Sequence, residues 1–162
     1  MNSVITDPNH EKWMGEALAL ARQAEHLNEV PVGAIVVKDD QIVGRGFNQP
    51  ISTNDPTAHA EMMALREAAK HLGNYRLVDC TLYVTIEPCT MCTGAMVHAR
   101  IKQLVYGARE LKSGAIESNA QLLDAHFFNH KIDWLGGVLS EECSALMSQF
   151  FKRRRDQVRK SK

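Results

Sequence analysis

Residues 81–98 read TLYVTIEPCTMCTGAMVH and decide the fold around them. The first six residues are mostly apolar, β-branched or aromatic, and they predict a strand that Glu87-Pro88 ends, because proline disfavours continuation. A helix is predicted from Cys89 to His98, with both cysteines of the segment in its first turn. Helix N-termini stabilise anions, so thiolates are favoured at these two positions.

A second motif, His59-Ala60-Glu61, lies upstream of this segment. A helix is predicted over His59–His71 and ends at Gly73, which places His59 and Glu61 in its first turn. Both motifs therefore lie at helix starts, just after a loop or a strand. This arrangement commonly directs side chains toward one point at the carboxyl edge of a sheet.

One imidazole and two thiolates are a suitable ligand set for a single metal ion. His59, Cys89 and Cys92 predict a tetrahedral Zn²⁺ site with an open fourth position, as in catalytic rather than structural zinc sites. Zinc lowers the pKa of a bound water to about 7, and Glu61 is well placed to take the proton of that water. The spacing therefore predicts metal-assisted hydrolysis.

Each part of this pattern has a simpler interpretation when it is taken alone. His59 would usually be an ordinary core or surface histidine, C-x-x-C is also a redox spacing, and Glu61 would be a solvated helix residue. Together the parts form H-x-E…P-C-x-x-C, which resembles the signature of the zinc-dependent nucleobase deaminases.

Composition limits the class of protein. A chain of 162 residues that is 44% hydrophobic fits a single domain over residues 1–162. No apolar run of about 18 residues predicts a transmembrane helix, and residues 1–10 lack the features of a signal peptide. Four cysteines, two of them expected metal ligands, favour a reducing, cytoplasmic location. Cys80 and Cys143 are assigned no role.

Charge is distributed unevenly although the formal net charge is zero. Residues 152–162 contain seven lysines and arginines against one acidic residue, Asp156, so the rest of the chain is acidic. A basic tail on an acidic body indicates a polyanionic partner such as nucleic acid. The alternative is a solvated helix end whose cations oppose the helix dipole, and charge alone favours neither.

The remaining pattern alternates helices and strands. A first helix is predicted from Asp7-Pro8 to before Pro31, and a basic C-terminal helix, capped by Ser140, over about residues 140–160. The expected buried faces of these two helices are Trp13, Ala17, Leu20, Ala21, Ala24 and Leu27, then Cys143, Leu146, Met147, Phe150 and Phe151. Further strands are predicted at Val32–Val37, Gln41–Phe47, Ile101–Tyr106 and Lys131–Val138, with a loop over 48–57 and a loop plus short helix over 107–129 on the active-site side. The predicted fold is α/β, a three-layer α/β/α sandwich around a mixed sheet of about five strands.

Nearly the whole chain resembles the bacterial tRNA-specific adenosine deaminases, which convert a wobble adenosine to inosine and belong to the cytidine deaminase superfamily. The resemblance is carried by Glu29–Ala34, Asn54–Glu61, Asn74–Leu77, Thr81–Thr85, Gly94–Met96 and Phe150–Arg155. It implies a cytidine deaminase-like fold, one zinc per subunit held by His59, Cys89 and Cys92, and Glu61 as the proton shuttle. It also implies that Asn48 hydrogen-bonds the target base, whereas the residues alone favour a turn residue before Pro50. The implied nucleophile is hydroxide activated by zinc, which attacks C6 and releases ammonia.

The resemblance further implies RNA contacts and a partner subunit. Glu110, where the family often has aspartate, and Lys112 lie in a segment expected to contact a ribose beside the target. Arg154 and Arg155 are expected at phosphates of the tRNA anticodon arm. Phe150 and Phe151 are further candidates for contact with the RNA, although at least one of them is expected in the core rather than as a stacking platform. Family members are homodimers, so a homodimer is expected, and no membrane association.

Two rival functions remain open at this point. A deaminase of free bases or nucleotides, such as guanine deaminase, would share the zinc motifs, but it would not need Asn48 in its Asn-x-Pro context or the basic helix. A zinc-stabilised RNA-binding module without turnover would not need Glu61 at an open coordination position. A protein with any of these three functions would bind zinc, so metal content does not distinguish them.

Overall fold

A five-stranded sheet forms the centre of the computed structural model, which describes residues 8–161. Strands β1 (Gly33–Lys38), β3 (Thr81–Ile86) and β4 (Gln103–Ala108) are buried along nearly their whole length, as expected for strands covered on both faces. Strands β2 (Gln41–Phe47) and β5 (Asp133–Gly136) form the two edges, in the order β2-β1-β3-β4-β5.

The sheet is mixed, as predicted. β1 pairs antiparallel with both β2 and β3, while β3, β4 and β5 pair in parallel. All strands except β1 therefore run in the same direction, and their carboxyl ends lie at one edge of the sheet. That edge carries both motifs that are predicted to bind a metal.

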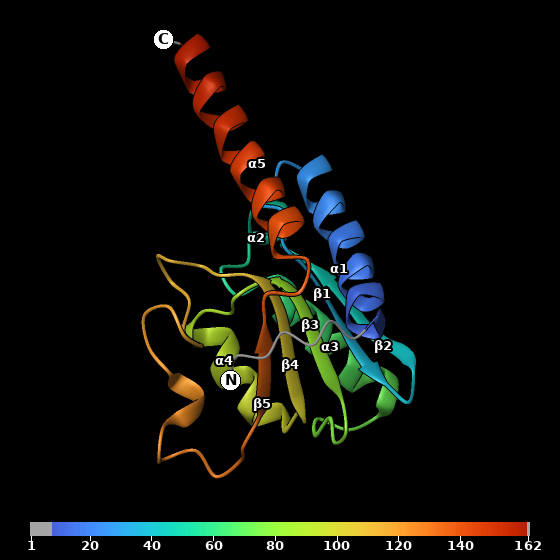
Figure 1. Ribbon diagram of the computed structural model, residues 1–162. Coiled ribbons are helices and arrows are strands. Elements are labelled where there is room, and N and C mark those ends of the chain that lie inside the picture. The colour runs from blue at the N-terminus through green and yellow to red at the C-terminus, as the bar shows by residue number, and fades with distance from the viewer. Residues whose placement is uncertain (1–7, 162) are drawn as a thin grey trace.

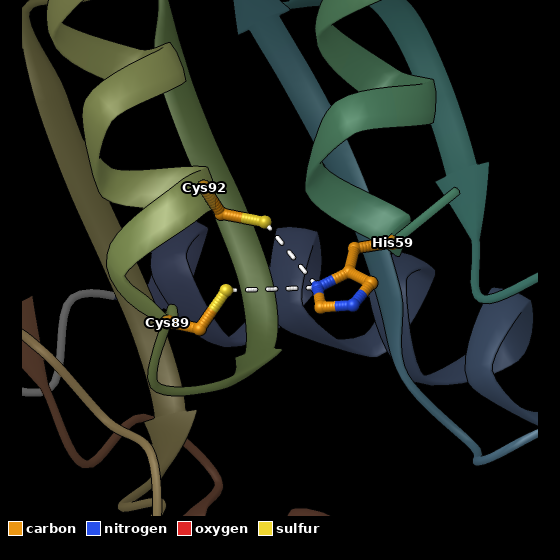
Figure 2. Close-up of side chains that lie close together, drawn as sticks. All are labelled: His59, Cys89 and Cys92. Atoms are coloured by element: carbon orange, nitrogen blue, oxygen red, sulfur yellow. Dashed lines mark hydrogen bonds between the residues drawn. The ribbon is translucent and has the colours of Figure 1, made fainter. Parts of the chain in front are cut away.

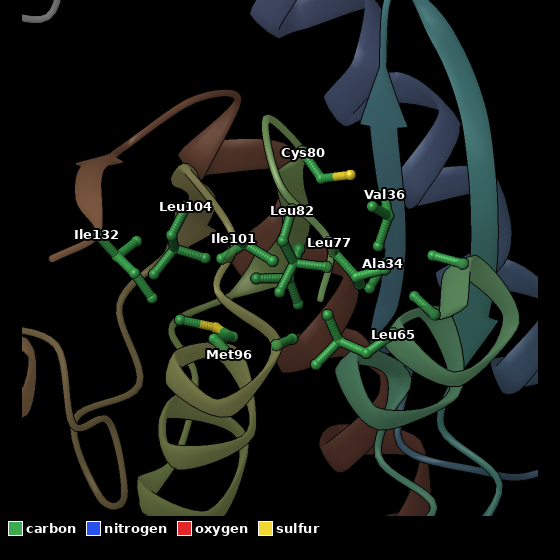
Figure 3. Close-up of a cluster of buried hydrophobic side chains, with 14 of the residues drawn as sticks. Ala34, Val36, Leu65, Leu77, Cys80, Leu82, Met96, Ile101, Leu104 and Ile132 are labelled. Carbon is green, nitrogen blue, oxygen red and sulfur yellow. The ribbon is translucent and has the colours of Figure 1, made fainter. Parts of the chain in front are cut away.

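Helices cover both faces of the sheet, so the three-layer sandwich is confirmed (Figure 1). One core cluster joins the sheet to α3 (Ala60–Leu72) and α4 (Thr90–Ala99), and part of it is drawn in Figure 3. The other cluster joins the opposite face to α1 (Pro8–His26) and the start of α5 (Ser140–Lys160). Close packing locates α3: a Cβ added to Gly46 in β2 would lie 2.6 Å from the Ala64 nitrogen.

Several predicted boundaries need correction. The segment 48–57 was expected to be only a loop, but it contains a short helix α2 (Pro50–Thr53), which starts at a proline that already has a helical φ. The expected strand Ile101–Tyr106 lies two residues later as β4, and the expected strand over 131–138 shortens to β5. The short helix predicted within 107–129 is η1 (Leu122–Asp124).

The predicted apolar faces of the first and last helices are only partly correct. Leu27 is 51% exposed, because α1 ends at His26 and Leu27 lies in the following turn. In α5, Cys143 and Phe150 are buried, whereas Leu146 and Met147 are half-buried and Phe151 is exposed. The reason is visible in Figure 1: only the first part of α5 packs on the sheet, and the rest of the helix projects beyond it.

Two further predictions concern the ends of the chain and membranes. Asp7, expected at the helix start, most of the segment 1–10 and Lys162 of the basic tail lie outside the described residues. None of the helices within residues 8–161 combines the length and the apolarity needed to cross a membrane.

Tyr106 provides a test of packing, because its hydroxyl is the one buried side-chain polar atom without a hydrogen-bond partner in residues 8–161. Leaving a buried hydroxyl unpaired costs about 1–3 kcal/mol. We therefore expect Tyr106→Phe to raise the free energy of unfolding by about 1 kcal/mol in urea titrations. Tyr83→Phe is the matched control, since the Tyr83 hydroxyl bonds His10 Nδ1 at 2.8 Å and its loss should lower stability. A Tyr106→Phe variant less stable than the native protein would contradict the expectation.

Candidate active site

The carboxyl edge of the sheet brings together segments that are distant in the sequence. β2 leads into Asn48, β3 into Glu87 to Cys89, and β4 into the segment 109–112. His59 and Cys89 are the N-cap residues of α3 and α4, so they lie just before the first helical turns rather than within them as predicted. Neither side chain makes a capping hydrogen bond. Both remain available to a ligand.

His59, Cys89 and Cys92 form one cluster, with their side chains directed at a common point (Figure 2). The His59 Nδ1 atom lies 3.7 Å from the Cys89 sulfur and 3.6 Å from the Cys92 sulfur. Neighbouring sulfur and nitrogen ligands of a tetrahedral zinc ion lie about 3.5 Å apart, given bonds of about 2.3 and 2.0–2.1 Å. The donor set and its spacing therefore fit zinc, as the sequence predicted.

The two sulfur atoms are electrostatically unequal. The hydrogen bond from Cys92 lowers the pKa of Cys89 to about 4, although burial opposes the shift, and His59 adds to the lowering. The same hydrogen bond, together with burial, raises the pKa of Cys92. The pair thus holds one thiolate and one thiol, and a bound cation would displace the second proton.

Glu61 lies in the first turn of α3, two residues beyond His59, and its side chain is only 3% exposed. Burial raises the pKa of its carboxyl to about 7, and the negative charge of Cys89 acts in the same direction, against the opposing effect of His59. A carboxyl group whose pKa lies near neutrality both accepts and donates protons readily. Its position beside the ligand cluster suits a proton shuttle.

Asn48 lies half-buried at the end of β2. Its side-chain oxygen accepts a hydrogen bond from the Ala60 N–H at 2.9 Å, at the start of α3. This bond assigns the oxygen to the helix, so the NH₂ group is the part of the amide that remains for a ligand. The sequence left two roles open for Asn48, base contact or turn residue. The structure shows a third, because the Asn48 oxygen binds the first N–H of α3, and it leaves the NH₂ group for a ligand.

Sequence reasoning missed Glu29, which is 1% exposed and supports the Asn48 segment. Its carboxylate accepts hydrogen bonds from the Ile51 N–H at 3.2 Å and the Ser52 N–H at 2.6 Å, and from the Ser52 hydroxyl at 2.6 Å. Burial alone would raise the pKa of Glu29, but these bonds outweigh it and lower the pKa overall. The signal in the sequence was an isolated glutamate before an apolar run, which carries no indication of its partners.

Glu29→Gln is expected to reduce the free energy of unfolding by about 1–2 kcal/mol at pH 7. Because the pKa of Glu29 is lowered on folding, its stabilisation is complete above the unfolded pKa of about 4.3 and disappears as the pH falls through the folded value. The difference between variant and native protein should therefore shrink toward about pH 3. Urea titrations at both pH values test this, with the exposed Glu16→Gln as control. An equal deficit at both values would exclude the ionised carboxylate as its source.

A cavity of about 770 Å³ lies between α5 and the segment 109–112. It gathers five of the six expected RNA-contacting residues: Glu110, Lys112, Phe151, Arg154 and Arg155. The sixth, Phe150, is buried, and the Arg154 guanidinium lies 5.3 Å from its ring centre. We call this cavity the basic cleft. None of its lining residues belongs to the metal-ligand cluster.

Four arginines of α5 divide between two directions. Arg153 forms an ion pair with Glu25 of α1. Arg154, Arg155 and Arg159 line the basic cleft instead, with Arg109 and Lys112 on the opposite wall. The gathering of five cations at one concave, partly apolar surface favours a polyanionic ligand over a merely solvated helix end.

Comparisons with known proteins agree with this site. The family model of the MafB19-like deaminases matches residues 8–155. The tRNA-specific adenosine deaminase of Haemophilus influenzae is 53% identical over 148 residues, which cover 91% of this chain and 86% of that protein. The protein of the same name from Streptococcus pyogenes serotype M1 is 43% identical over 150 residues, covering 93% and 88%.

Solved structures show the same likeness. One, from a study of A-to-I editing by tRNA:A34 deaminases at the wobble position of transfer RNA, matches with a TM-score of 0.81 and 41% identity, and covers 83% of this chain and 98% of that one. The guanine deaminase from Nitrosomonas europaea matches with a TM-score of 0.77 and 25% identity, covering 91% and 86%.

Proposed function

This chain belongs to the MafB19-like deaminase family and to the tRNA-specific adenosine deaminases, and on that premise we propose that it converts adenosine 34 of a tRNA anticodon to inosine with release of ammonia. The observation that carries the proposal is Glu61, buried in the first turn of α3 beside His59, Cys89 and Cys92, with a pKa of about 7. The basic cleft supports an RNA substrate rather than a free base, because a free base offers no phosphates to its arginines.

We propose that His59 Nδ1 and the sulfur atoms of Cys89 and Cys92 hold one Zn²⁺ ion. When bound there, zinc supplies a water activated for nucleophilic attack near neutral pH. The Glu61 carboxylate takes a proton from the attacking water and delivers protons to the purine ring and to the amino group on C6. The C6–nitrogen bond then breaks, ammonia leaves, and the oxygen remains on C6 as the carbonyl of inosine.

Asn48 orients the base in this scheme. Since its oxygen is held by the Ala60 N–H, its NH₂ group donates to an acceptor on the purine ring. Glu110 and Lys112 would contact the nucleotide beside the target, and Arg154 and Arg155 the phosphates. Phe151 is exposed in the basic cleft and is available for stacking on a base. The ring of Phe150 instead packs against the Arg154 guanidinium.

Three wider features belong to the same proposal. Residues 1–162 form one deaminase domain with α5 as its basic C-terminal helix, supported by two core clusters that share one sheet. The protein acts as a homodimer, as the family resemblance implies. It works in the cytoplasm, where tRNA is found and where its four cysteines, all free, stay reduced.

The direct test is inosine formation in a purified tRNA that carries adenosine at position 34, with free adenosine, guanine and cytidine assayed in parallel. Inosine in the tRNA alone is the expected result. Ammonia released only from a free base would keep the zinc chemistry and overturn the substrate. No turnover on any substrate by zinc-loaded protein would favour the RNA-binding module.

A further inference from the structure

Glu87 is a buried carboxylate whose hydrogen-bonding capacity is used entirely by one distant segment. Its side chain is 2% exposed and lies at the end of β3, directly before Pro88 and Cys89. Its Oε1 atom accepts hydrogen bonds from the Glu110 N–H at 3.0 Å and from the Ser118 hydroxyl. Its Oε2 atom accepts from three successive backbone N–H groups, those of Ile116, Glu117 and Ser118, at 3.0, 2.8 and 2.9 Å.

The burial of the Glu87 carboxylate has an energetic cost that its hydrogen bonds must offset. An ionised carboxylate is costly to bury unless donors compensate for the lost water, and here all five donors come from the segment 110–118. The Ala115 N–H also donates to the Pro88 carbonyl at 2.9 Å. A Cβ on Gly114 would collide with the Glu87 carboxyl group. The segment 110–118 therefore packs closely around Glu87, which directly precedes Pro88 and Cys89.

The same contacts extend to the wall of the basic cleft. The bond from the Glu110 N–H places Glu110, whose own carboxylate accepts a hydrogen bond from the Lys112 N–H at 3.0 Å. Both residues line the cleft opposite α5. A chain of hydrogen bonds therefore runs from the end of β3, next to Cys89, to two residues that line the basic cleft.

We propose that Glu87 is a positioning residue that sets the RNA-contacting wall of the basic cleft relative to the metal-ligand turn. This inference rests on the proposed function, since it assigns the cleft to the anticodon arm. Glu87 acts through Glu110 and Lys112 and contacts no reacting atom. Its loss should consequently weaken RNA binding and leave the chemical step nearly intact.

Glu87→Gln is the primary variant, because glutamine has the same shape but only one acceptor oxygen. With that oxygen in the place of Oε2 it keeps the three bonds to residues 116–118. Its NH₂ group then faces the Glu110 N–H and the Ser118 hydroxyl, so the bonds that these two groups donate to Oε1 are lost. We expect KM and Kd for an anticodon stem-loop RNA to rise about tenfold, with kcat changed less than about twofold and zinc content unchanged. Ser118→Ala removes one donor only and should raise KM by about two- to threefold.

A double-mutant cycle distinguishes positioning from general destabilisation. Lys112→Ala should cost less RNA affinity in the Glu87→Gln background than in the native protein, because the wall that carries Lys112 is already displaced. Glu67→Gln is the matched control: Glu67 is exposed and accepts a hydrogen bond from the Arg45 N–H on the opposite edge of the sheet. It should leave KM and kcat unchanged.

Defined outcomes would overturn the inference. Unchanged KM and Kd in Glu87→Gln, additive effects in the cycle, or a fall in kcat with unchanged KM would each exclude it. If Glu87→Gln fails to fold, an unchanged KM in Ser118→Ala has the same meaning. Inosine formation by the native protein is measured separately from the variants. Native protein that makes no inosine in tRNA would contradict the proposed function rather than the role of Glu87.

Discussion

Replacing Glu61 by alanine is expected to lower kcat for inosine formation by about 10²- to 10⁴-fold while the zinc content of the protein stays unchanged. The reason is that Glu61 is the buried carboxyl group with a pKa of about 7 beside the ligand cluster, and alanine can neither accept nor return a proton there. Single-turnover assays with an anticodon stem-loop RNA measure the chemical step directly.

Binding should survive this substitution, because Glu61 is not required to hold the metal or the RNA. The Kd for the stem-loop is expected to change by less than about threefold, which would assign the loss to the transition state. Glu61→Gln separates ionisation from volume and should be nearly as slow as alanine. Unchanged turnover in Glu61→Ala would remove Glu61 from the mechanism.

Replacing Cys92 by alanine should abolish inosine formation through loss of the metal. Cys92 is fully buried within the cluster, and a site reduced to one imidazole and one thiolate binds zinc far more weakly. A metal that binds only the folded protein stabilises it, so the melting temperature of Cys92→Ala should be lower than that of the native protein. A chelator should lower the melting temperature of the native protein but not that of the variant. Metal analysis and thermal unfolding with and without chelator test both statements.

Cys80→Ala is the matched control for this substitution. Cys80 is equally buried, lies outside the cluster, and has no predicted role. Its replacement should retain zinc and turnover, with only the modest loss of stability that follows removal of a buried sulfur. Full zinc content in Cys92→Ala would exclude Cys92 as a ligand.

Much of the architecture was predictable because local patterns dictate it. The strand β3 followed from a β-branched run ended by Pro88, and α4 and α3 were predicted to begin at Cys89 and His59, with α3 ending at Gly73. The helix α2 was not predicted because a distant residue stabilises it: the buried Glu29 carboxylate accepts hydrogen bonds from the first N–H groups of this helix. Exposure of Phe151 was missed because periodicity does not reveal where α5 leaves the sheet.

The sequence by itself determined the donor set of the candidate metal site, the neighbouring carboxyl group and the basic helix, because short spacings at helix starts restrict where these side chains lie. Only the tertiary structure decided which atom of Asn48 is free, which arginines face the basic cleft, and that Glu87 holds the segment 110–118. Those features depend on hydrogen bonds and packing between residues far apart in the chain. Long-range contacts of this kind leave no periodic pattern in a single sequence, since each requires only one polar side chain in the right place.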